Sequence, residues 1–184
     1  MPITCPKIVA LGDSITYGFP YLPDRSWVRL AADELGLQMI NKGINGDTTW
    51  GMLERFSADV LAHRPSHVII VGGANDAFER IAAEDVVNNI RQMVKAAIDN
   101  AIVPFLGLPT PCNFAEETLL AKYRQSLRQY VATEGIDVID FYSAMVNLVG
   151  SGIREGLHVD GIHPNEAGYQ IMAGVAVGFL RYRV

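Results

Sequence analysis

The chain contains little cysteine. Its 184 residues include only Cys5 and Cys112, which lie far apart and match no metal-ligand spacing. This scarcity argues against a disulfide framework and against a cysteine-based metal site. We therefore expect two unpaired thiols, as in a reducing compartment.

Positive charge and long apolar runs are also scarce. Fifteen Lys and Arg residues face twenty Asp and Glu residues, and the net charge of −5 disfavours binding to nucleic acid or to an anionic membrane. The longest apolar run, Ile171–Leu180, is about half as long as the ~20 residues of a membrane span. Met1–Lys7 shows no charged leader followed by an apolar stretch. These absences predict a cytoplasmic protein with a small-molecule substrate, no nucleic-acid partner and no integral membrane segment.

Repeats, low-complexity segments and linkers are absent as well, so residues 1–184 are predicted to form a single domain. Short apolar runs alternate with amphipathic stretches. Strands are predicted at Lys7–Leu11, Gln38–Asn41, His67–Val71, Ile102–Leu106 and Asp137–Ile139. Helices are predicted at Ser26–Leu35, Thr48–His63, Glu84–Asn100 and Glu116–Glu134, and a last long helix follows His163 with Pro164 at N1 and Glu166 near N3. This alternation predicts an α/β fold with a parallel five-stranded sheet and helices on both faces.

Polar residues follow the predicted strands. Ser14 follows the first strand, Gly46 the second and Asn75 the third, and Asp160 and His163 come after the fifth. Ligands of such sheets bind outside the carboxyl ends of the strands. Residues scattered along the chain are therefore expected to meet at one edge of the sheet.

Three of these residues have the chemistry of nucleophilic acyl transfer. We predict that Ser14 is the nucleophile, because a serine hydroxyl with a base in reach can attack a carbonyl carbon. His163 is the predicted base, and Asp160 would orient its imidazole from the same loop. His158 lies close enough to Asp160 in sequence to compete as the base or to line the pocket.

An oxyanion formed in such a reaction needs hydrogen-bond donors. We assign the backbone N–H groups of Ser14 and Gly46 and the side-chain amide of Asn75 to this oxyanion hole. Two neighbouring carboxylates are expected to be structural. Asp47 is predicted to cap the following helix, and Asp76 to order the loop that carries Asn75.

Four short blocks of the sequence together resemble the SGNH hydrolases, also called GDSL lipases and esterases. The blocks are Gly-Asp-Ser-Ile, Ile-Asn-Gly-Asp-Thr, Gly-Gly-Ala-Asn-Asp and Asp-Gly-Ile-His-Pro-Asn, in the order of that family, and they span Ile8 to about Tyr169. By motif, Ser14, Gly46, Asn75 and His163 match its four signature residues, with Asp160 as the acid. The resemblance implies a flavodoxin-like α/β/α sandwich, no metal or other cofactor, and hydrolysis of esters or thioesters. Ile15 replaces the leucine of the family name, which is a common apolar exchange.

The identity of the substrate stays open at this level. Loops at Phe19–Arg25 and Thr110–Glu117 are expected to set substrate choice, in an open site that takes short or medium acyl groups. The predicted substrate-binding residues are Asp13, Tyr17, Pro111, Cys112 and Ile162. Compact members of the family include thioesterase/lysophospholipases and carbohydrate acetylesterases, so the leaving group could be an alcohol, a thiol or a sugar hydroxyl. The oligomeric state is open too.

A binding module is the competing interpretation. The loop Asp13–Gly18 of a flavodoxin-type sheet could hold a phosphate or a flavin at a helix N-terminus. Against it, Asp13 would place a carboxylate beside the phosphate, and Asp160 and His163 would have no role.

Overall fold

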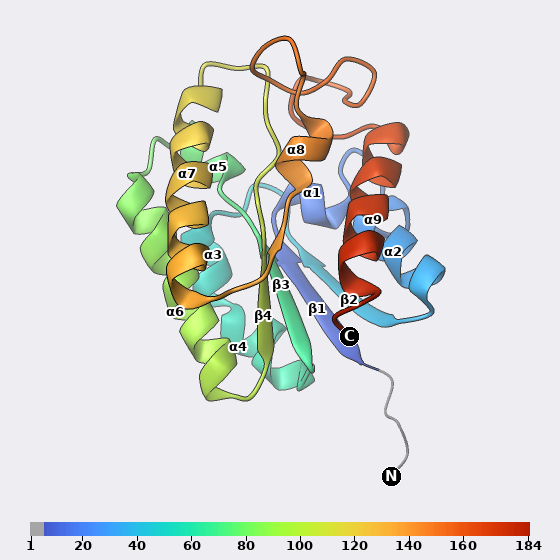
Figure 1. Cartoon of the computed structure of the whole chain (residues 1–184), viewed down its shortest axis with the longest axis vertical. Helices are drawn as coiled ribbons and strands as arrows, with labels where there is room; N and C mark the ends of the chain where they lie inside the picture. The colour runs from blue at the N-terminus through green and yellow to red at the C-terminus, as the bar shows by residue number, and fades with distance from the viewer. Residues whose placement is uncertain (1–5) are drawn as a thin grey trace.

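Five parallel strands form the centre of the molecule in a computed structural model, which describes residues 6–184 (Figure 1). They are β1 (Lys7–Gly12), β2 (Gln38–Gly43), β3 (His67–Val71), β4 (Val103–Gly107) and β5 (Val138–Ile139). Their order across the sheet is β2-β1-β3-β4-β5, with every neighbouring pair parallel. This is the flavodoxin-like order, so the predicted fold class is confirmed.

Helices cover both faces of this sheet (Figure 1). The α-helices of the described residues are α1 (Ser14–Tyr17), α2 (Trp27–Leu35), α3 (Thr49–Glu54), α4 (Phe56–Asp59), α5 (Ala74–Phe78), α6 (Ala83–Asp99), α7 (Glu117–Glu134), α8 (Phe141–Met145) and α9 (Glu166–Leu180), with short 3₁₀ turns at Pro23–Arg25 and Leu61–His63. The helices α3, α4, α6 and α7 pack on one face, and α2, α8 and α9 pack on the other. Among residues 6–184, no helix combines the length and the apolar character that crossing a membrane requires.

The central strands are apolar on both sides because both faces are covered. In β1, Val9 and Leu11 point into the core beneath α6 and α7, whereas Ile8 and Ala10 point into the core beneath α2 and α9. All four side chains are fully buried. The unbroken apolar runs of the sequence are thus a consequence of the three-layer arrangement.

The helix predicted at Thr48–His63 is broken in the structure. Arg55 separates α3 from α4 with φ −92° and ψ 2°, and its N–H bonds to the carbonyls of Gly51 and Leu53. Met52, Phe56 and Val60 still pack in one core, so the apolar spacing of four persists across the break. The prediction of one continuous helix was wrong, because apolar residues spaced by four occur in an interrupted helix as well as in a continuous one.

Two predicted helix starts also differ from the structure. The last helix begins at Glu166, not at Pro164, because the side chain of Asn165 caps it by accepting a hydrogen bond from the Gly168 N–H at 3.0 Å. In α3 the cap is Thr48, whose Oγ1 accepts from the Gly51 N–H at 3.3 Å, and not Asp47. The carboxylate of Asp47 is used elsewhere, as described below.

Candidate catalytic site at the carboxyl edge of the sheet

Ser14 stands on a tight turn between β1 and α1. Asp13 caps α1, since its Oδ1 accepts a hydrogen bond from the Ile15 N–H at 2.9 Å. A side chain at Gly12 would collide with the Thr16 hydroxyl and would lie 2.6 Å from the Val71 carbonyl oxygen. The turn therefore needs glycine before Asp13, and it presents Ser14 at the first position of a helix.

Ser14, His163 and Asp160 form one hydrogen-bonded chain. The Ser14 Oγ lies 3.0 Å from His163 Nε2, although the two residues are 149 positions apart in the sequence. On the other side of the ring, His163 Nδ1 lies 2.7 Å from Asp160 Oδ2. A carboxylate at Nδ1 keeps the proton there and leaves the lone pair of Nε2 facing the hydroxyl. Such a chain can take a proton from a serine that attacks a carbonyl carbon.

Asp160 is held as a carboxylate by its own loop. Its Oδ1 accepts hydrogen bonds from the N–H groups of Ile162 at 3.0 Å and His163 at 2.8 Å. Partial burial acts to raise the pKa of Asp160, but the hydrogen bonds from the His163 ring and from the two backbone groups outweigh it and hold the pKa below its ordinary value. The aspartate therefore stays charged where a positive imidazole would need it.

The ring of Phe19 packs against the ring of His163. The two ring centroids are 4.6 Å apart, and the rings are tilted by 59°. The carbonyl of Phe19 accepts a hydrogen bond from the Tyr169 hydroxyl at 2.7 Å, which anchors this residue to α9. The sequence pointed to the loop Phe19–Arg25, but no sequence pattern singled out Phe19 as the neighbour of the histidine.

His158 is engaged away from Ser14. Its Nδ1 accepts from the Gly161 N–H at 2.9 Å, and its Nε2 lies 3.2 Å from the side-chain nitrogen of Asn113. Of the two candidate bases in this loop, the structure brings His163 to the serine.

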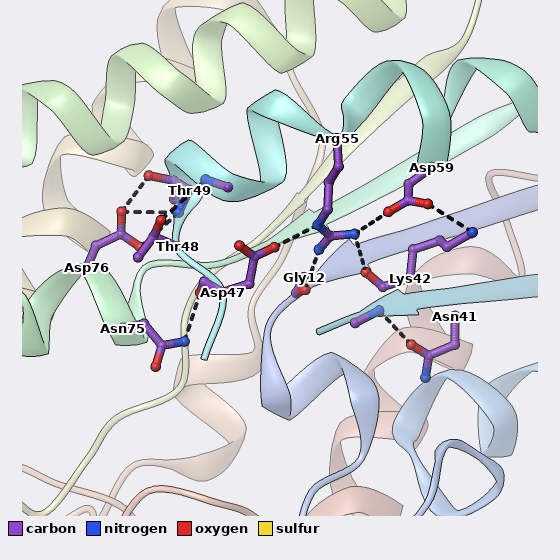
Figure 2. A network of polar contacts seen from close by, with 12 residues as sticks. Gly12, Asn41, Lys42, Asp47, Thr48, Thr49, Arg55, Asp59, Asn75 and Asp76 are labelled. Carbon is purple, nitrogen blue, oxygen red and sulfur yellow. Dashed lines mark hydrogen bonds and ion pairs between the residues drawn. The ribbon is translucent and has the colours of Figure 1, made fainter. Parts of the chain in front are cut away.

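Gly46 lies on the loop that follows β2, and Asn75 lies in the first turn of α5, which follows β3. Gly46 is exposed and has φ +77°, a left-handed conformation that glycine adopts without strain. The Nδ2 of Asn75 donates a hydrogen bond to the Asp47 carbonyl at 2.8 Å, which uses one of its two amide hydrogens and fixes the direction of the other (Figure 2). Both residues therefore stand at the same edge of the sheet as Ser14.

Asp76 has the structural role that the sequence predicts. Its carboxylate accepts from the Thr49 N–H at 3.0 and 3.1 Å and from the Thr49 hydroxyl at 2.5 Å (Figure 2). Burial raises the pKa of Asp76, and these hydrogen bonds partly oppose the rise. The contacts tie α5, which carries Asn75, to the start of α3.

Asp13 is a buried carboxyl beside the serine. Its side chain is only 2% exposed. Burial raises its pKa to about 7, and the charges of Asp76 and Asp47 act in the same direction. The sequence singled out Asp13 for substrate contact and gave no sign of this burial.

The other predicted substrate-binding residues are in two settings. Pro111 and Cys112 are buried, and the Cys112 N–H donates to Glu117 Oε2 at 2.9 Å. Burial also raises the pKa of the Cys112 thiol, which makes it a poor nucleophile. Tyr17 and Ile162 are partly exposed. Residues 6–184 contain no group of three or more His, Cys, Asp or Glu side chains arranged to hold a metal ion.

Two exposed aromatic side chains lie between the Asn75 segment and the loop that carries Asp160 and His163. Phe78 follows Asn75 on α5, and its ring packs edge-on against Phe114, with centroids 5.8 Å apart. Phe114 in turn lies against Gly161, where an added Cβ would be 3.3 Å from its ring. An apolar surface thus extends between the Asn75 segment and the loop of Asp160 and His163.

Comparison with known proteins gives a consistent result. Residues 10–171 match the model of the GDSL-like Lipase/Acylhydrolase family. Esterase TesA of Pseudomonas aeruginosa is 28% identical over 163 residues, covering 85% of this chain and 79% of that protein. Thioesterase 1/protease 1/lysophospholipase L1 of Escherichia coli K12 is 28% identical over 166 residues, covering 86% and 75%. A structure described as a lipolytic protein of the G-D-S-L family from Desulfitobacterium hafniense superimposes with a TM-score of 0.89 at 32% identity, covering 94% of this chain and 98% of that one.

Proposed function

The chain belongs to the GDSL-like lipase/acylhydrolase family, and on that premise we propose that it is a serine esterase acting through Ser14, His163 and Asp160. The observation that carries the proposal is the hydrogen-bonded chain from the Ser14 hydroxyl through both ring nitrogens of His163 to Asp160. Under this proposal residues 1–184 form one catalytic domain that needs no cofactor. The cytoplasmic location stays a prediction from the sequence.

The reaction proceeds in two halves. Ser14 Oγ attacks the carbonyl carbon of the ester while His163 Nε2 takes the hydroxyl proton, and Asp160 stabilises the resulting imidazolium. His163 then returns the proton to the leaving oxygen as the ester bond breaks, which leaves an acyl group on Ser14. A water molecule, deprotonated by the same histidine, releases the acid and restores the serine.

Three groups are assigned to the oxyanion of the tetrahedral intermediate. They are the backbone N–H of Ser14, the backbone N–H of Gly46 and the side-chain amide of Asn75. Two observations support this assignment. Ser14 is the first residue of α1, where backbone N–H groups have no partner within the helix. The Asn75 amide is oriented by the Asp47 carbonyl, so one of its N–H groups is preset and does not have to be ordered during the reaction.

We propose short or medium acyl esters as substrates. Phe19, Phe78 and Phe114 are exposed by 37%, 43% and 45%, and they give the edge of the site an apolar surface for an acyl group. Partly exposed Tyr17 and Ile162 remain proposed contacts for the substrate. The names of the relatives include thioesterase, lysophospholipase and acetylxylan esterase, so thioesters, lysophospholipids and acetylated carbohydrates are the alternatives within this family. The phosphate- or flavin-binding alternative is not supported, because buried Asp13 already caps α1 where an anion would bind.

The test is hydrolysis of p-nitrophenyl esters from acetate to palmitate. Ser14→Ala should reduce turnover to the uncatalysed background. Ser57→Ala is the matched control, because Ser57 is an exposed serine of α4, and it should keep the wild-type rate. Activity retained by Ser14→Ala would refute the serine mechanism. A rate optimum at long acyl chains would refute the proposed chain-length range and leave the serine mechanism standing.

A further inference from the structure

We propose that Arg55 is a positioning residue for ester hydrolysis, which holds the backbone that leads to the proposed oxyanion donors. This inference rests on the proposed esterase function and deepens it. Arg55 lies outside the four motif blocks, in the break between α3 and α4, and it is absent from the predicted site.

The guanidinium group of Arg55 joins four acceptors (Figure 2). Its Nε donates to Asp47 Oδ2 at 2.7 Å, and its Nη2 donates to the carbonyl of Gly12 at 2.9 Å. Its Nη1 donates both to the carbonyl of Lys42 at 2.9 Å and to Asp59 Oδ2 at 2.8 Å. The side chain is only 15% exposed, so these bonds are largely shielded from water.

Two of the four acceptors, the carbonyls of Gly12 and Lys42, lie at the ends of strands that lead to proposed oxyanion donors. Gly12 ends β1, two residues before Ser14. Lys42 is the penultimate residue of β2, whose end leads to Gly46. One planar group therefore fixes the ends of two neighbouring strands, from which two of the three proposed oxyanion donors continue.

Asp47 links Arg55 to the third donor. Its side chain binds Arg55, while its carbonyl accepts the hydrogen bond that orients the Asn75 amide (Figure 2). An added Cβ at Gly51 would collide with the Asp47 carboxylate, so the missing side chain at that position of α3 leaves room for it. A shift of Asp47 would move both the Asn75 amide and the neighbouring Gly46.

Charge requires a cation at this position, and geometry requires that it be arginine. Asp59 receives hydrogen bonds from Arg55 and from Lys42, the latter at 2.9 Å. Burial acts to raise the pKa of Asp59, but these two cations outweigh it and hold the pKa below its ordinary value. The cluster therefore contains two carboxylates and two cations. A lysine at position 55 would keep the charge but lack the planar fork that reaches several acceptors at once.

The experiment is a double-mutant cycle on kcat and KM with a p-nitrophenyl ester. The variants are Arg55→Lys, Asn75→Ala and the double variant, with Arg29→Lys as the matched control. Arg29 also donates from Nε to an aspartate Oδ2 at 2.8 Å, namely that of Asp33, but this pair is exposed on α2. Ser14→Ala and the thermal midpoint of each variant are measured in parallel.

We expect Arg55→Lys to lower kcat by about 10- to 100-fold with little change in KM, because loss of one whole oxyanion donor costs about 10²–10³. In the Asn75→Ala background, the same substitution should lower kcat by a clearly smaller factor, because one of the groups that it positions is gone. Arg29→Lys should leave kcat unchanged. A general loss of stability would instead lower activity by the same factor in both backgrounds.

The inference is overturned if Arg55→Lys keeps kcat within about twofold of wild type, or if its effect is equal in the two backgrounds. If Arg55→Lys does not fold, Asp47→Asn replaces it in the cycle, since it weakens the Arg55 contact but keeps the carbonyl that orients Asn75. An unchanged kcat for Asp47→Asn would likewise overturn the inference. Full activity of Ser14→Ala would instead refute the esterase proposal itself, so the two failures are distinguishable.

Discussion

Replacing Asp13 with asparagine should stabilise the protein increasingly as the pH rises. Asparagine is as good a helix cap as aspartate, so the hydrogen bond from the Ile15 N–H to this side chain is retained. What the substitution removes is a carboxyl group that burial makes costly to ionise. Its pKa rises from 3.8 to about 7 in the folded protein.

The sign and size of the effect follow from proton linkage. At a pH below 3.8 the Asp13 carboxyl is protonated in both the folded and the unfolded chain, so its ionisation does not change the free energy of unfolding. As the pH rises towards 7, the unfolded chain loses this proton while the folded chain keeps it, and the free energy of unfolding therefore falls. Each pKa unit corresponds to about 1.4 kcal/mol, so the accumulated loss is on the order of 4 kcal/mol above pH 7.

Urea denaturation of wild type and Asp13→Asn at several pH values between about 4 and 8 measures this effect. The difference in the free energy of unfolding should be small in acid and grow with pH in favour of the variant. Asp33→Asn is the control, because Asp33 forms only the exposed pair with Arg29 and should contribute less than about 1 kcal/mol. A difference for Asp13→Asn that does not change with pH would refute the reasoning, since it would mean that Asp13 is already ionised in the folded protein at low pH.

Two further substitutions test separate parts of the structure. Asp160→Asn should keep the fold but lower kcat by about 10³- to 10⁴-fold, because an amide at His163 Nδ1 favours the tautomer that carries its proton on Nε2. Ester hydrolysis measures this loss, and a decrease below tenfold would contradict the expectation. Glu117→Gln should lower the free energy of unfolding by about 3–5 kcal/mol, because Glu117 pairs with Arg124, which is 2% exposed and would be left as an uncompensated charge. Urea denaturation at neutral pH measures this loss, and a change below about 1 kcal/mol would show that the carbonyls of Pro109 and Thr110, to which Arg124 Nη1 donates at 3.4 Å, compensate the charge without Glu117.

The strands and the edge where the site lies could be predicted from the sequence because both follow from backbone topology. A strand segment buried on both faces must be apolar, and Ile8–Leu11 of β1 and Val68–Val71 of β3 are. Parallel strands end at the same edge, so Ser14 after β1 and Asn75 after β3 were expected at one edge of the sheet, where the structure also brings His163 to the Ser14 hydroxyl. The limits of β1, β2, β4 and β5 differ from the predicted ones by one or two residues, with no effect on this convergence.

The limits of the helices were harder to predict because competing signals lie side by side. Pro164 and Asn165 both suit a helix start, and the side chain of Asn165 decides it by capping α9. Asp47 and Thr48 both suit a cap for α3, and Thr48 takes that role while Asp47 binds Arg55. In each case the outcome depends on contacts that local sequence preferences do not contain.

The contacts of Arg55 beside the site also depend on tertiary structure and not on local sequence preferences. Arg55 binds Gly12, which is 43 residues away, through an ordinary backbone carbonyl that no sequence pattern marks. The motif blocks identify groups proposed to touch the reacting atoms, such as Ser14 and Asn75, whereas the contacts proposed to position these groups come from Arg55 and from a backbone carbonyl that could belong to any residue type. A substitution at Arg55 would therefore leave all four blocks intact. The sequence would still carry the complete motif set, and we expect that only the positions of the proposed oxyanion donors would change.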